Sequence, residues 1–241
     1  MQQSFTINVC LAPPLFPYFK NTGAIVIIVD ILRATTSICA AIMNGAKEII
    51  PVGSEDELKE YQSKGFLIAG ERDGKTLCFA DIGNSPHYFT PGIVKGKTIA
   101  YSTTNGTRIV EMAKDCHMLI AGSFYHLQPL ADMLSRANHD VIIFCAGWKN
   151  KFNLEDTLFA GALTTRLLSK GSHRTNCDSA IAAADLWKQA EADVPAYLEK
   201  SAWIKRLKLY DVMHECLRTN ITNCIPVFNN GSFKINTEIN H

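Results

Sequence analysis

The stretch "IVIIVDILRATTSICAAIMNGA", residues 25–46, decides the fold that the sequence predicts. It opens with a run of β-branched apolar residues, which is typical of a strand that is covered on both faces. A helical pattern follows over about residues 35–44, and Gly45 ends it. A buried strand that leads directly into a helix predicts one unit of an α/β protein.

The same alternation of strands and helices extends along most of the chain. Further strands are expected at residues 4–11, 47–53, 66–70, 98–102, 116–122 and 140–147, the first of them at a sheet edge. Further helices are expected at residues 54–65, 105–114, 123–137 and 155–169. This pattern predicts an α/β fold in three layers, α/β/α, with a largely parallel or mixed sheet and helices on both faces.

The C-terminal part of the chain has a different character. Residues 178–193 and 201–218 are expected to be helical, and residues 224–236 predict a β-hairpin that turns at Asn230 and Gly231. We expect this tail to pack on the sheet.

A long stretch without clear periodicity interrupts the alternation at residues 71–96. A loop of this length inside a compact domain is usually functional, so we expect it to border a site. We treat residues 1–241 as a single catalytic unit. Two α/β lobes, about 1–137 and 138–241, would hold the site between them.

The composition excludes several classes of function. The chain has 24 basic and 23 acidic side chains among 241 residues and no basic run with interleaved aromatics, so a nucleic-acid partner is not expected. The sequence has neither a signal-peptide pattern nor an apolar segment of membrane-spanning length, so no membrane partner is expected. None of the eight cysteines is spaced as C-x-x-C, which favours reduced thiols and a cytoplasmic protein. A homodimer is a further expectation, because most soluble oligomers are symmetric pairs.

Polar residues gather where the expected strands end, which is where open α/β sheets bind their ligands. They are Asp30, Arg33 and Thr35 after the first buried strand, Glu71 and Arg72 after "FLIAG", the run "TTNGT" at 103–107, and Glu155 and Asp156 after "DVIIFCAG". A phosphate ester suits this mixture, because it attracts cations and the N–H groups at a helix start. The carboxylates would repel the same ester unless a hard cation such as Mg²⁺ lay between them.

Each of these features also has a purely structural interpretation. Asp30 could cap the following helix, and Glu71 with Arg72 could be a surface ion pair. "TTNGT" could be a turn, and Glu155 with Asp156 could be favourable first-turn charges. The prediction of a site therefore rests on their coincidence at one edge of the sheet. A nucleotide-binding loop is excluded at "PGIVKGKT", because Pro91 stands where the first glycine is required and a strand follows.

Six ordered motifs resemble those of a known family. The segments "VDILRATTSI", "GERDG", "DIGNSP", "TTNGT", "CAG" and "LEDTLFAG" occur in this order across residues 29–161. Together they resemble the 2-phosphosulfolactate phosphatase (ComB) family, and the tail is similar to the end of that family. The resemblance implies a Mg²⁺-dependent hydrolase that converts (R)-2-phospho-3-sulfolactate to (R)-3-sulfolactate and phosphate, a step of coenzyme M biosynthesis. It also implies an α/β/α fold of the family's own type.

The resemblance further implies roles for individual residues. The metal ligands would be Asp30, Glu71 and Asp156, with Glu155 as their neighbour. The phosphate contacts would be Arg33, Thr35, Thr104, Asn105, Gly106 and Thr107. The carboxylate and sulfonate of the small anionic organophosphate substrate would contact Arg72, Asn84 and Ser85.

Several alternatives stay open at this point. Asp30 or Asp156 could serve as base or nucleophile instead of metal ligand, with Arg33 as the third catalytic candidate. The substrate could be another 2-phospho-hydroxy acid. The chain could also be an anion-binding α/β protein without turnover.

Overall fold

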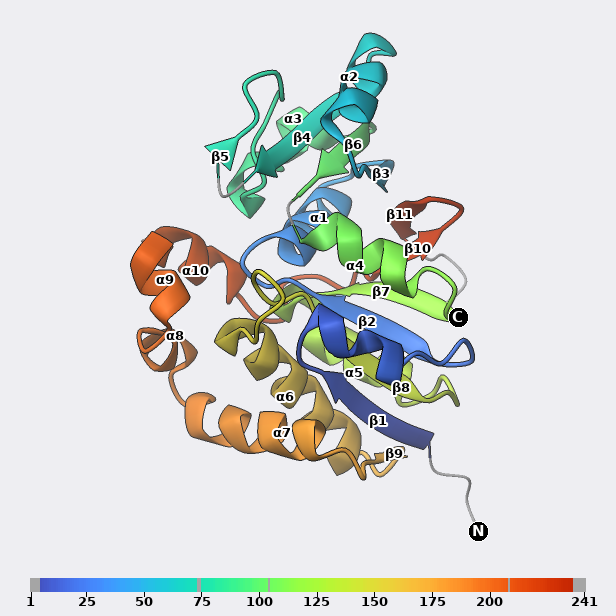
Figure 1. The fold of residues 1–241 in the computed structure, drawn as a ribbon, viewed down its shortest axis with the longest axis vertical. Helices are drawn as coiled ribbons and strands as arrows, with labels where there is room; N and C mark the ends of the chain where they lie inside the picture. Colours follow the sequence, from blue (N-terminus) through green and yellow to red (C-terminus); the bar gives the residue numbers. More distant parts are fainter. Residues whose placement is uncertain (1–4, 73–74, 104, 208, 236–241) are drawn as a thin grey trace.

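The computed structural model describes residues 5–72, 75–103, 105–207 and 209–235. Among these residues the strands form one eleven-stranded sheet in the order β5-β4-β6-β3-β11-β10-β7-β2-β8-β1-β9 (Figure 1). The strands are β1 (Phe5–Cys10), β2 (Ile25–Val29), β3 (Glu48–Pro51), β4 (Leu67–Arg72), β5 (Lys75–Thr76), β6 (Thr98–Ser102), β7 (Met118–Gly122), β8 (Val141–Cys145), β9 (His173–Arg174), β10 (Pro226–Asn229) and β11 (Ser232–Ile235). The antiparallel pairs involve β5 and the hairpin β10–β11, and the other pairs are parallel. The predicted mixed, largely parallel sheet is confirmed.

Strand β2 lies in the middle of the parallel part of the sheet, between β7 and β8, and all of its residues are buried. Its side chains alternate between two hydrophobic cores. Ile25, Ile27 and Val29 pack in one core, while Val26 and Ile28 pack in the other. The two cores lie on opposite faces of the sheet, which explains why this strand has no polar position until it ends.

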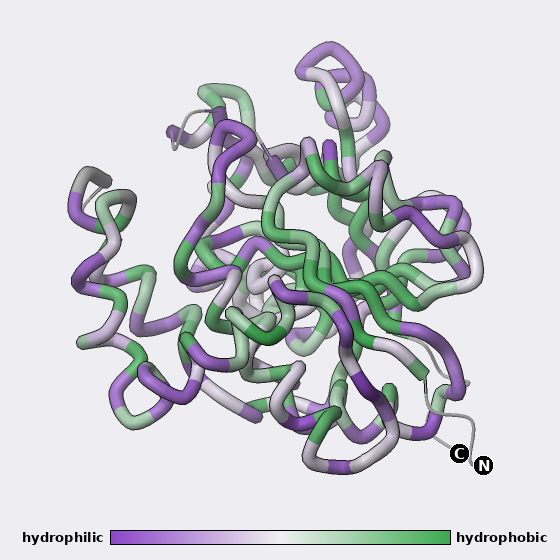
Figure 2. The backbone as a smooth tube through the Cα atoms, turned by 60° about the horizontal axis from the view of Figure 1, so that its bottom comes forward, coloured by the Kyte–Doolittle hydropathy of each residue, from purple (hydrophilic) through white to green (hydrophobic). Residues whose placement is uncertain are grey.

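Helices cover both faces, as the sequence predicts (Figure 1). They are α1 (Ala34–Met43), α2 (Glu55–Ser63), α3 (Pro91–Val94), α4 (Gly106–Ala113), α5 (Leu127–Leu134), α6 (Leu154–Ser169), α7 (Asp178–Ala190), α8 (Val194–Leu198), α9 (Ala202–Leu207) and α10 (Tyr210–Cys216). Helices α5, α6 and α7 contribute to the first core, and α1 and α4 to the second. Figure 2 shows the apolar segments concentrated in the centre and the hydrophilic ones toward the outside.

Several predicted boundaries shift in the structure. The expected edge strand β1 lies one place from the edge, because the two-residue strand β9 pairs with it. The helical region 201–218 is divided into α9 and α10, and the helix expected at 123–137 begins with the short 3₁₀ helix Phe124–His126. The long loop 71–96 contains β5, the 3₁₀ helix Pro86–Tyr88 and α3.

The C-terminal hairpin occupies an unexpected place. Its predicted turn is confirmed, because Asn230 and Gly231 have φ angles of 50° and 84°. The tail is expected to pack on the sheet, and α7 does so against β1, whereas the strands of the hairpin belong to the sheet itself. β11 pairs with β3 through Phe233 and Ile49, and β10 pairs with β7. The hairpin thereby joins the strands β4, β6 and β3 to the strands β7, β2, β8 and β1.

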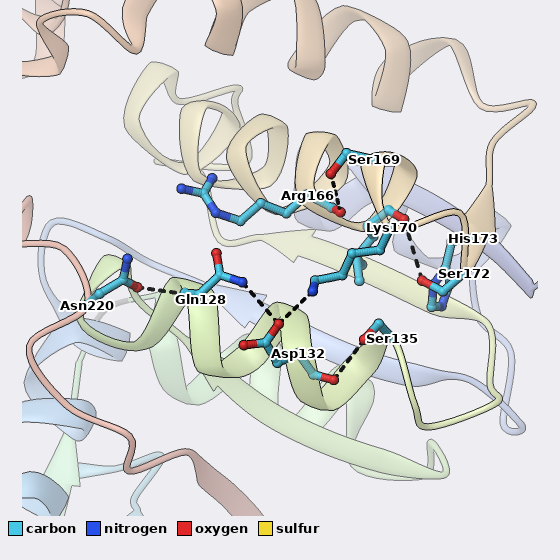
Figure 3. A network of polar contacts seen from close by, with 10 residues as sticks. Gln128, Asp132, Ser135, Arg166, Ser169, Lys170, Ser172, His173 and Asn220 are labelled. Atoms are coloured by element: carbon cyan, nitrogen blue, oxygen red, sulfur yellow. Dashed lines mark hydrogen bonds and ion pairs between the residues drawn. The ribbon is translucent and has the colours of Figure 1, made fainter.

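A polar network ties α5 to α6 and to the segment after α10 (Figure 3). Lys170 Nζ lies 2.7 Å from Asp132 Oδ1, and Gln128 Nε2 donates to the same oxygen at 3.0 Å. The backbone N–H of Gln128 donates to Asn220 Oδ1 at 2.7 Å. The ion pair is about one-third exposed, so it contributes at most about 1 kcal/mol. The hydrogen bond from Gln128 to Asn220 connects α5 to the segment that leads to the hairpin.

All eight cysteines are free, which agrees with the predicted reduced thiols. Within the described ranges, no helix has both the length and the apolar character needed to cross a bilayer.

Candidate functional site

The turn from β2 into α1 is built around Asp30 and Thr35. Asp30 Oδ1 accepts hydrogen bonds from the N–H groups of Arg33 at 2.9 Å and Ala34 at 3.4 Å. Thr35 Oγ1 accepts from the N–H of Asp30 and donates to its carbonyl, both at 3.0 Å. Asp30 therefore does support the start of the helix through one carboxylate oxygen. The hydroxyl of Thr35 is occupied by the turn itself.

The start of α6 brings two more carboxylates to this turn. Asp156 Oδ1 accepts from the N–H of Ile31 and Asp156 Oδ2 from the N–H of Gly147, both at 3.0 Å. These two bonds connect the β2–α1 turn to the β8–α6 turn and hold the carboxylate in place. Glu155 is equally buried, with 1% of its surface exposed. Its Oε2 atom has no hydrogen-bond partner among the described residues.

The carboxylates influence one another strongly. Burial raises the pKa of Glu155 to about 7, with a further contribution from the charge of Asp30. Burial raises the pKa of Asp30 to about 6, and the charge of Glu71 also raises it. The pKa of Asp156 is raised well above its usual range by burial, and then by Glu155 and Asp30. Burial and their mutual charge make the ionisation of all these groups together unfavourable, and a bound cation would offset that effect.

Glu71 reaches this group from the other part of the sheet. It lies on β4, is 6% exposed, and its charge acts on Asp30 at the end of β2. The strands β6, β3, β11, β10 and β7 stand between these two strands in the sheet order. The structure therefore brings together carboxylates from β2, β4 and α6, as the sequence analysis expects for a site at the strand ends.

The donor set fits a hard divalent cation. Asp30, Glu155 and Asp156 are oxygen ligands of the kind that Mg²⁺ prefers, and the unpartnered Glu155 Oε2 is a buried acceptor that needs a positive group. Within the part of the chain that the structure describes, no three His, Cys, Asp or Glu side chains are arranged as a ready-made metal cluster. Mg²⁺ commonly takes one or two carboxylates together with waters and substrate oxygens, and the metal roles of these residues stay predictions.

Arg33 and the loop residues Asn84 and Ser85 form the cationic side of the site. Arg33 Nη1 donates to Ser85 Oγ at 3.4 Å, and Ser37 Oγ donates to the carbonyl of Asn84 at 2.6 Å. Arg33 Nε is buried and has no acceptor among the described residues. The first turns of α1 thus hold the loop against the carboxylates and leave a guanidinium donor for a ligand.

Three helix starts converge at this point. The side chain of Asn105, before α4, donates to the carbonyl of Gly147, before α6, at 3.3 Å. A Cβ atom on Gly106 would lie 2.9 Å from Cβ of Ala34, the first residue of α1. Thr103 Oγ1 accepts from the N–H of Gly106 at 2.9 Å. The backbone N–H groups and helix dipoles of α1, α4 and α6 favour an anion in such a place.

Two other predicted ligand contacts are directed toward protein partners. Arg72 Nη2 donates to Ser102 Oγ at 2.9 Å, and Arg72 Nε lies 3.9 Å from Glu55 Oε1. Thr107 Oγ1 donates to the carbonyl of Val52 at 3.3 Å. Thr104 lies outside the described residues. The roles that the sequence analysis gives to these residues stay predictions.

Tyr101 on β6 is a residue of this site that the sequence analysis missed. It is 3% exposed and packs edge-to-face on Phe89, with ring centroids 5.9 Å apart. Burial raises its pKa well above the usual range, with further contributions from the charges of Asp30 and Glu71. Its hydroxyl has no hydrogen-bond partner among the described side chains and backbone. The signal available in the sequence is a single phenol in the apolar strand "TIAYS".

Known proteins resemble this chain over most of its length. The profile of the family described as 2-phosphosulpholactate phosphatase matches residues 11–231. A probable 2-phosphosulfolactate phosphatase of Caldanaerobacter subterraneus subsp. tengcongensis is 34% identical over 213 residues, which cover 86% of this chain and 88% of the relative. Proteins with the same description from Prochlorococcus marinus and Thermotoga maritima are 38% and 33% identical, and the alignments cover 76% and 86% of this chain and 78% and 90% of those relatives.

Proposed function

The chain belongs to the 2-phosphosulpholactate phosphatase family, and from this premise we propose that it hydrolyses 2-phospho-3-sulfolactate to 3-sulfolactate and phosphate with the help of Mg²⁺. The observation that carries the proposal is the meeting of Asp30, Glu71, Glu155 and Asp156 with Arg33 at three helix starts. An arrangement of acidic groups beside anion-binding donors is what phosphoryl transfer with a divalent cation requires.

The carboxylate side of the site would hold the cation. Asp30 and Glu71 are the ligands we assign first, because the charge of Glu71 acts on Asp30, and the unpartnered Glu155 Oε2 then stays available as a proton acceptor. Asp156 uses both of its oxygens for backbone N–H groups, so it orients the two turns and supplies negative charge. Mg²⁺ would neutralise the charge that accumulates on the phosphoryl oxygens during transfer.

The donor side of the site would bind the phosphoryl group. Arg33 can offer Nε to a phosphoryl oxygen, and N–H groups of the first turn of α4 after Gly106 can offer further hydrogen bonds. The N–H groups at the start of α1 are bound to Asp30. Asn84 and Ser85 stand beside Arg33, where they would contact the acid groups of the substrate. Such positioning and charge stabilisation supply most of the catalysis in phosphoryl transfer.

The hydrolysis breaks the ester P–O bond and transfers the phosphoryl group to water. The attacking water gives up a proton, and the departing alkoxide of the hydroxy acid takes one. Glu155 Oε2 is an acceptor that could take the first proton, since burial keeps its pKa near neutral. Transient phosphorylation of Asp30 is the competing route, in which the same ester bond breaks.

The test is phosphate release from a panel of substrates with and without a chelator. The panel contains phosphorylated sulfolactate, lactate and malate, and phenyl phosphate as an ester without an acid group. We expect release that stops on chelation and resumes with Mg²⁺, with the highest kcat/KM for 2-phospho-3-sulfolactate. A higher kcat/KM for phosphomalate or phospholactate would identify another 2-phospho-hydroxy acid as substrate. Binding of phosphate without turnover of any ester would contradict the proposal and favour an anion-binding protein.

A further inference from the structure

The connection between β8 and α6 contains a tight turn with two lysines. Trp148 and Lys151 exchange backbone hydrogen bonds in both directions, each of 3.0 Å. Lys149 and Asn150 between them have φ angles of 49° and 64°, which is the backbone conformation of a two-residue type I′ turn. We call residues 148–151 the basic turn.

Gly147 fixes the shape of the basic turn. It has a φ angle of +59°, and a Cβ atom at this position would lie 2.1 Å from the carbonyl oxygen of Lys151. Any other residue at 147 would therefore have to move the backbone of the turn. The turn is defined by its backbone and does not depend on contacts of the lysine side chains.

The basic turn is attached to the carboxylate site on two sides. The N–H of Gly147 donates to Asp156 Oδ2 at 3.0 Å, and its carbonyl accepts from Asn105 Nδ2 at 3.3 Å. Arg108 of α4 donates to the side chain of Asn150. The turn thus lies at the entrance to α6, next to the start of α4.

The charges of the turn are not neutralised by the protein that surrounds it. Lys149 and Lys151 are exposed, and neither ammonium group is paired with a carboxylate among the described residues. Lys149 Nζ lies 4.9 Å from the centre of the Trp148 ring. This cation–π contact restrains the ammonium group and leaves its charge unpaired.

A multiply charged anion that approaches the site meets an electrostatic problem. Asp30, Glu155 and Asp156 repel it until it contacts the cation and Arg33. At ordinary ionic strength, a fixed charge acts on the incoming anion when it lies within about 10 Å of the anion's path to the site. Cations at the rim of a site can raise association rates by about 10-fold to 1,000-fold.

We propose that Lys149 and Lys151 form a substrate-collecting rim that favours phosphate esters carrying an additional acid group. This inference rests on the proposed phosphatase function and adds residues that determine capture and selectivity. The lysines act on the encounter with the substrate, so they raise kcat/KM and leave kcat nearly unchanged. Their contribution grows with the charge of the substrate and disappears at high salt.

The experiment compares the wild-type chain with the double variant Lys149→Gln/Lys151→Gln. The measured quantity is kcat/KM for 2-phospho-3-sulfolactate and for phenyl phosphate, at low and at high ionic strength. At low ionic strength we expect a loss of about tenfold for the phosphorylated acid, a smaller loss for phenyl phosphate, and kcat within about twofold of wild type. At high ionic strength the variant and the wild type should converge.

Two matched variants complete the design. Lys188→Gln removes an exposed lysine that pairs with Asp185 on α7. It should leave kcat/KM unchanged for both substrates at both ionic strengths. Lys149→Arg/Lys151→Arg keeps the charge and should retain the wild-type salt dependence. Circular dichroism of each variant verifies the fold, which the substitution of exposed side chains should not alter.

Equal salt dependence in the wild type and the Gln double variant would overturn the proposal. So would a loss that falls on kcat, or one that is the same for both substrates. If the wild-type chain released no phosphate from any ester, the proposed function would fail, and the role of the rim would be read from inorganic phosphate binding. A weaker and less salt-dependent affinity in the Gln double variant supports the rim in that case, and equal affinities overturn it.

Discussion

Asp30 serves both the fold and the site through different parts of one side chain. Its Oδ1 atom accepts two N–H groups at the start of α1, while its charge interacts with those of Glu71 and Glu155. The capping interpretation and the functional interpretation of the sequence are therefore compatible. A substitution at this position affects the start of the helix as well as any bound cation, so Asn is the appropriate replacement because it retains an acceptor oxygen.

Two buried tyrosines differ in how their hydroxyl groups are satisfied. Tyr125 Oη donates to Glu215 Oε1 at 2.7 Å, whereas the hydroxyl of Tyr101 has no partner in the described part of the chain. We predict that Tyr125→Phe lowers the free energy of unfolding by about 1–3 kcal/mol, because it removes a hydrogen bond to a carboxylate. Tyr101→Phe should leave it unchanged or raise it slightly, since it removes an unpaired polar group from the core. Urea unfolding measures both values.

The comparison is informative because the two substitutions are chemically identical. If Tyr101→Phe lowers the free energy of unfolding as much as Tyr125→Phe does, the Tyr101 hydroxyl has a hydrogen-bond partner. Ser37 is the nearest candidate, because its hydroxyl lies close enough to lower the pKa of Tyr101.

At the scale of secondary-structure elements, the site depends on the short distance between the start of α1 and the start of α4. A Cβ atom on Gly106 would lie 2.7 Å from Thr103 Oγ1 and 2.9 Å from Cβ of Ala34. We predict that Gly106→Ala lowers the free energy of unfolding by about 1–3 kcal/mol, because the helix starts must separate. It should also reduce phosphate release, since the N–H groups of α4 move away from the ligand.

Gly92→Ala in α3 is the matched control for this substitution. A Cβ atom at this position meets no atom within 4 Å, and alanine favours a helix by up to about 1 kcal/mol relative to glycine. We expect Gly92→Ala to be neutral or stabilising in the same thermal or urea unfolding experiment. A stabilising effect of Gly106→Ala would contradict the close approach of the two helix starts.

The elements themselves were largely predictable, because their signals are local. The apolar run of β2, the helix predicted at residues 54–65 and the Asn230–Gly231 turn each depend on a few neighbouring residues, and each is found in the structure. The insertion of the hairpin between β3 and β7 was not predictable. Strand pairing depends on partners far away in the sequence, here Ile49 for Phe233.

The candidate site was predictable in part, because the carboxyl ends of the parallel strands lie at the same edge of the sheet. Asp30 follows β2, Glu71 lies near the end of β4, and the acidic pair begins α6, and the charges of Glu71 and Glu155 both interact with that of Asp30. The orientation of polar side chains was not predictable, since Thr35 and Arg72 are engaged by nearby protein atoms. Tyr101 was missed because its position inside a strand gives no local sign of its neighbours.

At the scale of the whole molecule, the buried carboxylates couple stability to pH. The folded state raises the pKa of Glu155 from 4.5 to about 7, so it binds a proton more tightly than the unfolded chain. Tighter proton binding by Glu155 stabilises the folded state. This stabilisation is fully present below pH 4.5 and is lost as the pH rises through about 7. We predict that, without divalent cations, the free energy of unfolding falls between pH 5 and pH 8, by about 3 kcal/mol if this group acts alone.

The variant Glu155→Gln tests this dependence, because its amide cannot ionise. It should be more stable than wild type at pH 8 and similar to it at pH 5, and added Mg²⁺ should reduce the difference at pH 8. Asp132→Asn is the control, since the pKa of Asp132 is lowered by Lys170 and its contribution is lost only as the pH falls toward its folded value. The change that Asp132→Asn causes in the free energy of unfolding should be the same at pH 6 and at pH 8. An unchanged pH slope in Glu155→Gln would contradict the electrostatic coupling of the site.

The most direct measurement of the central claim is a calorimetric titration of Mg²⁺ into the protein in the presence of inorganic phosphate. We predict one Mg²⁺ per chain, with an affinity that falls at least about tenfold in Asp30→Asn and does not change in Asp132→Asn. Absence of Mg²⁺ binding, or an equal affinity in wild type and Asp30→Asn, would contradict the claim that these carboxylates jointly hold a cation beside a phosphate.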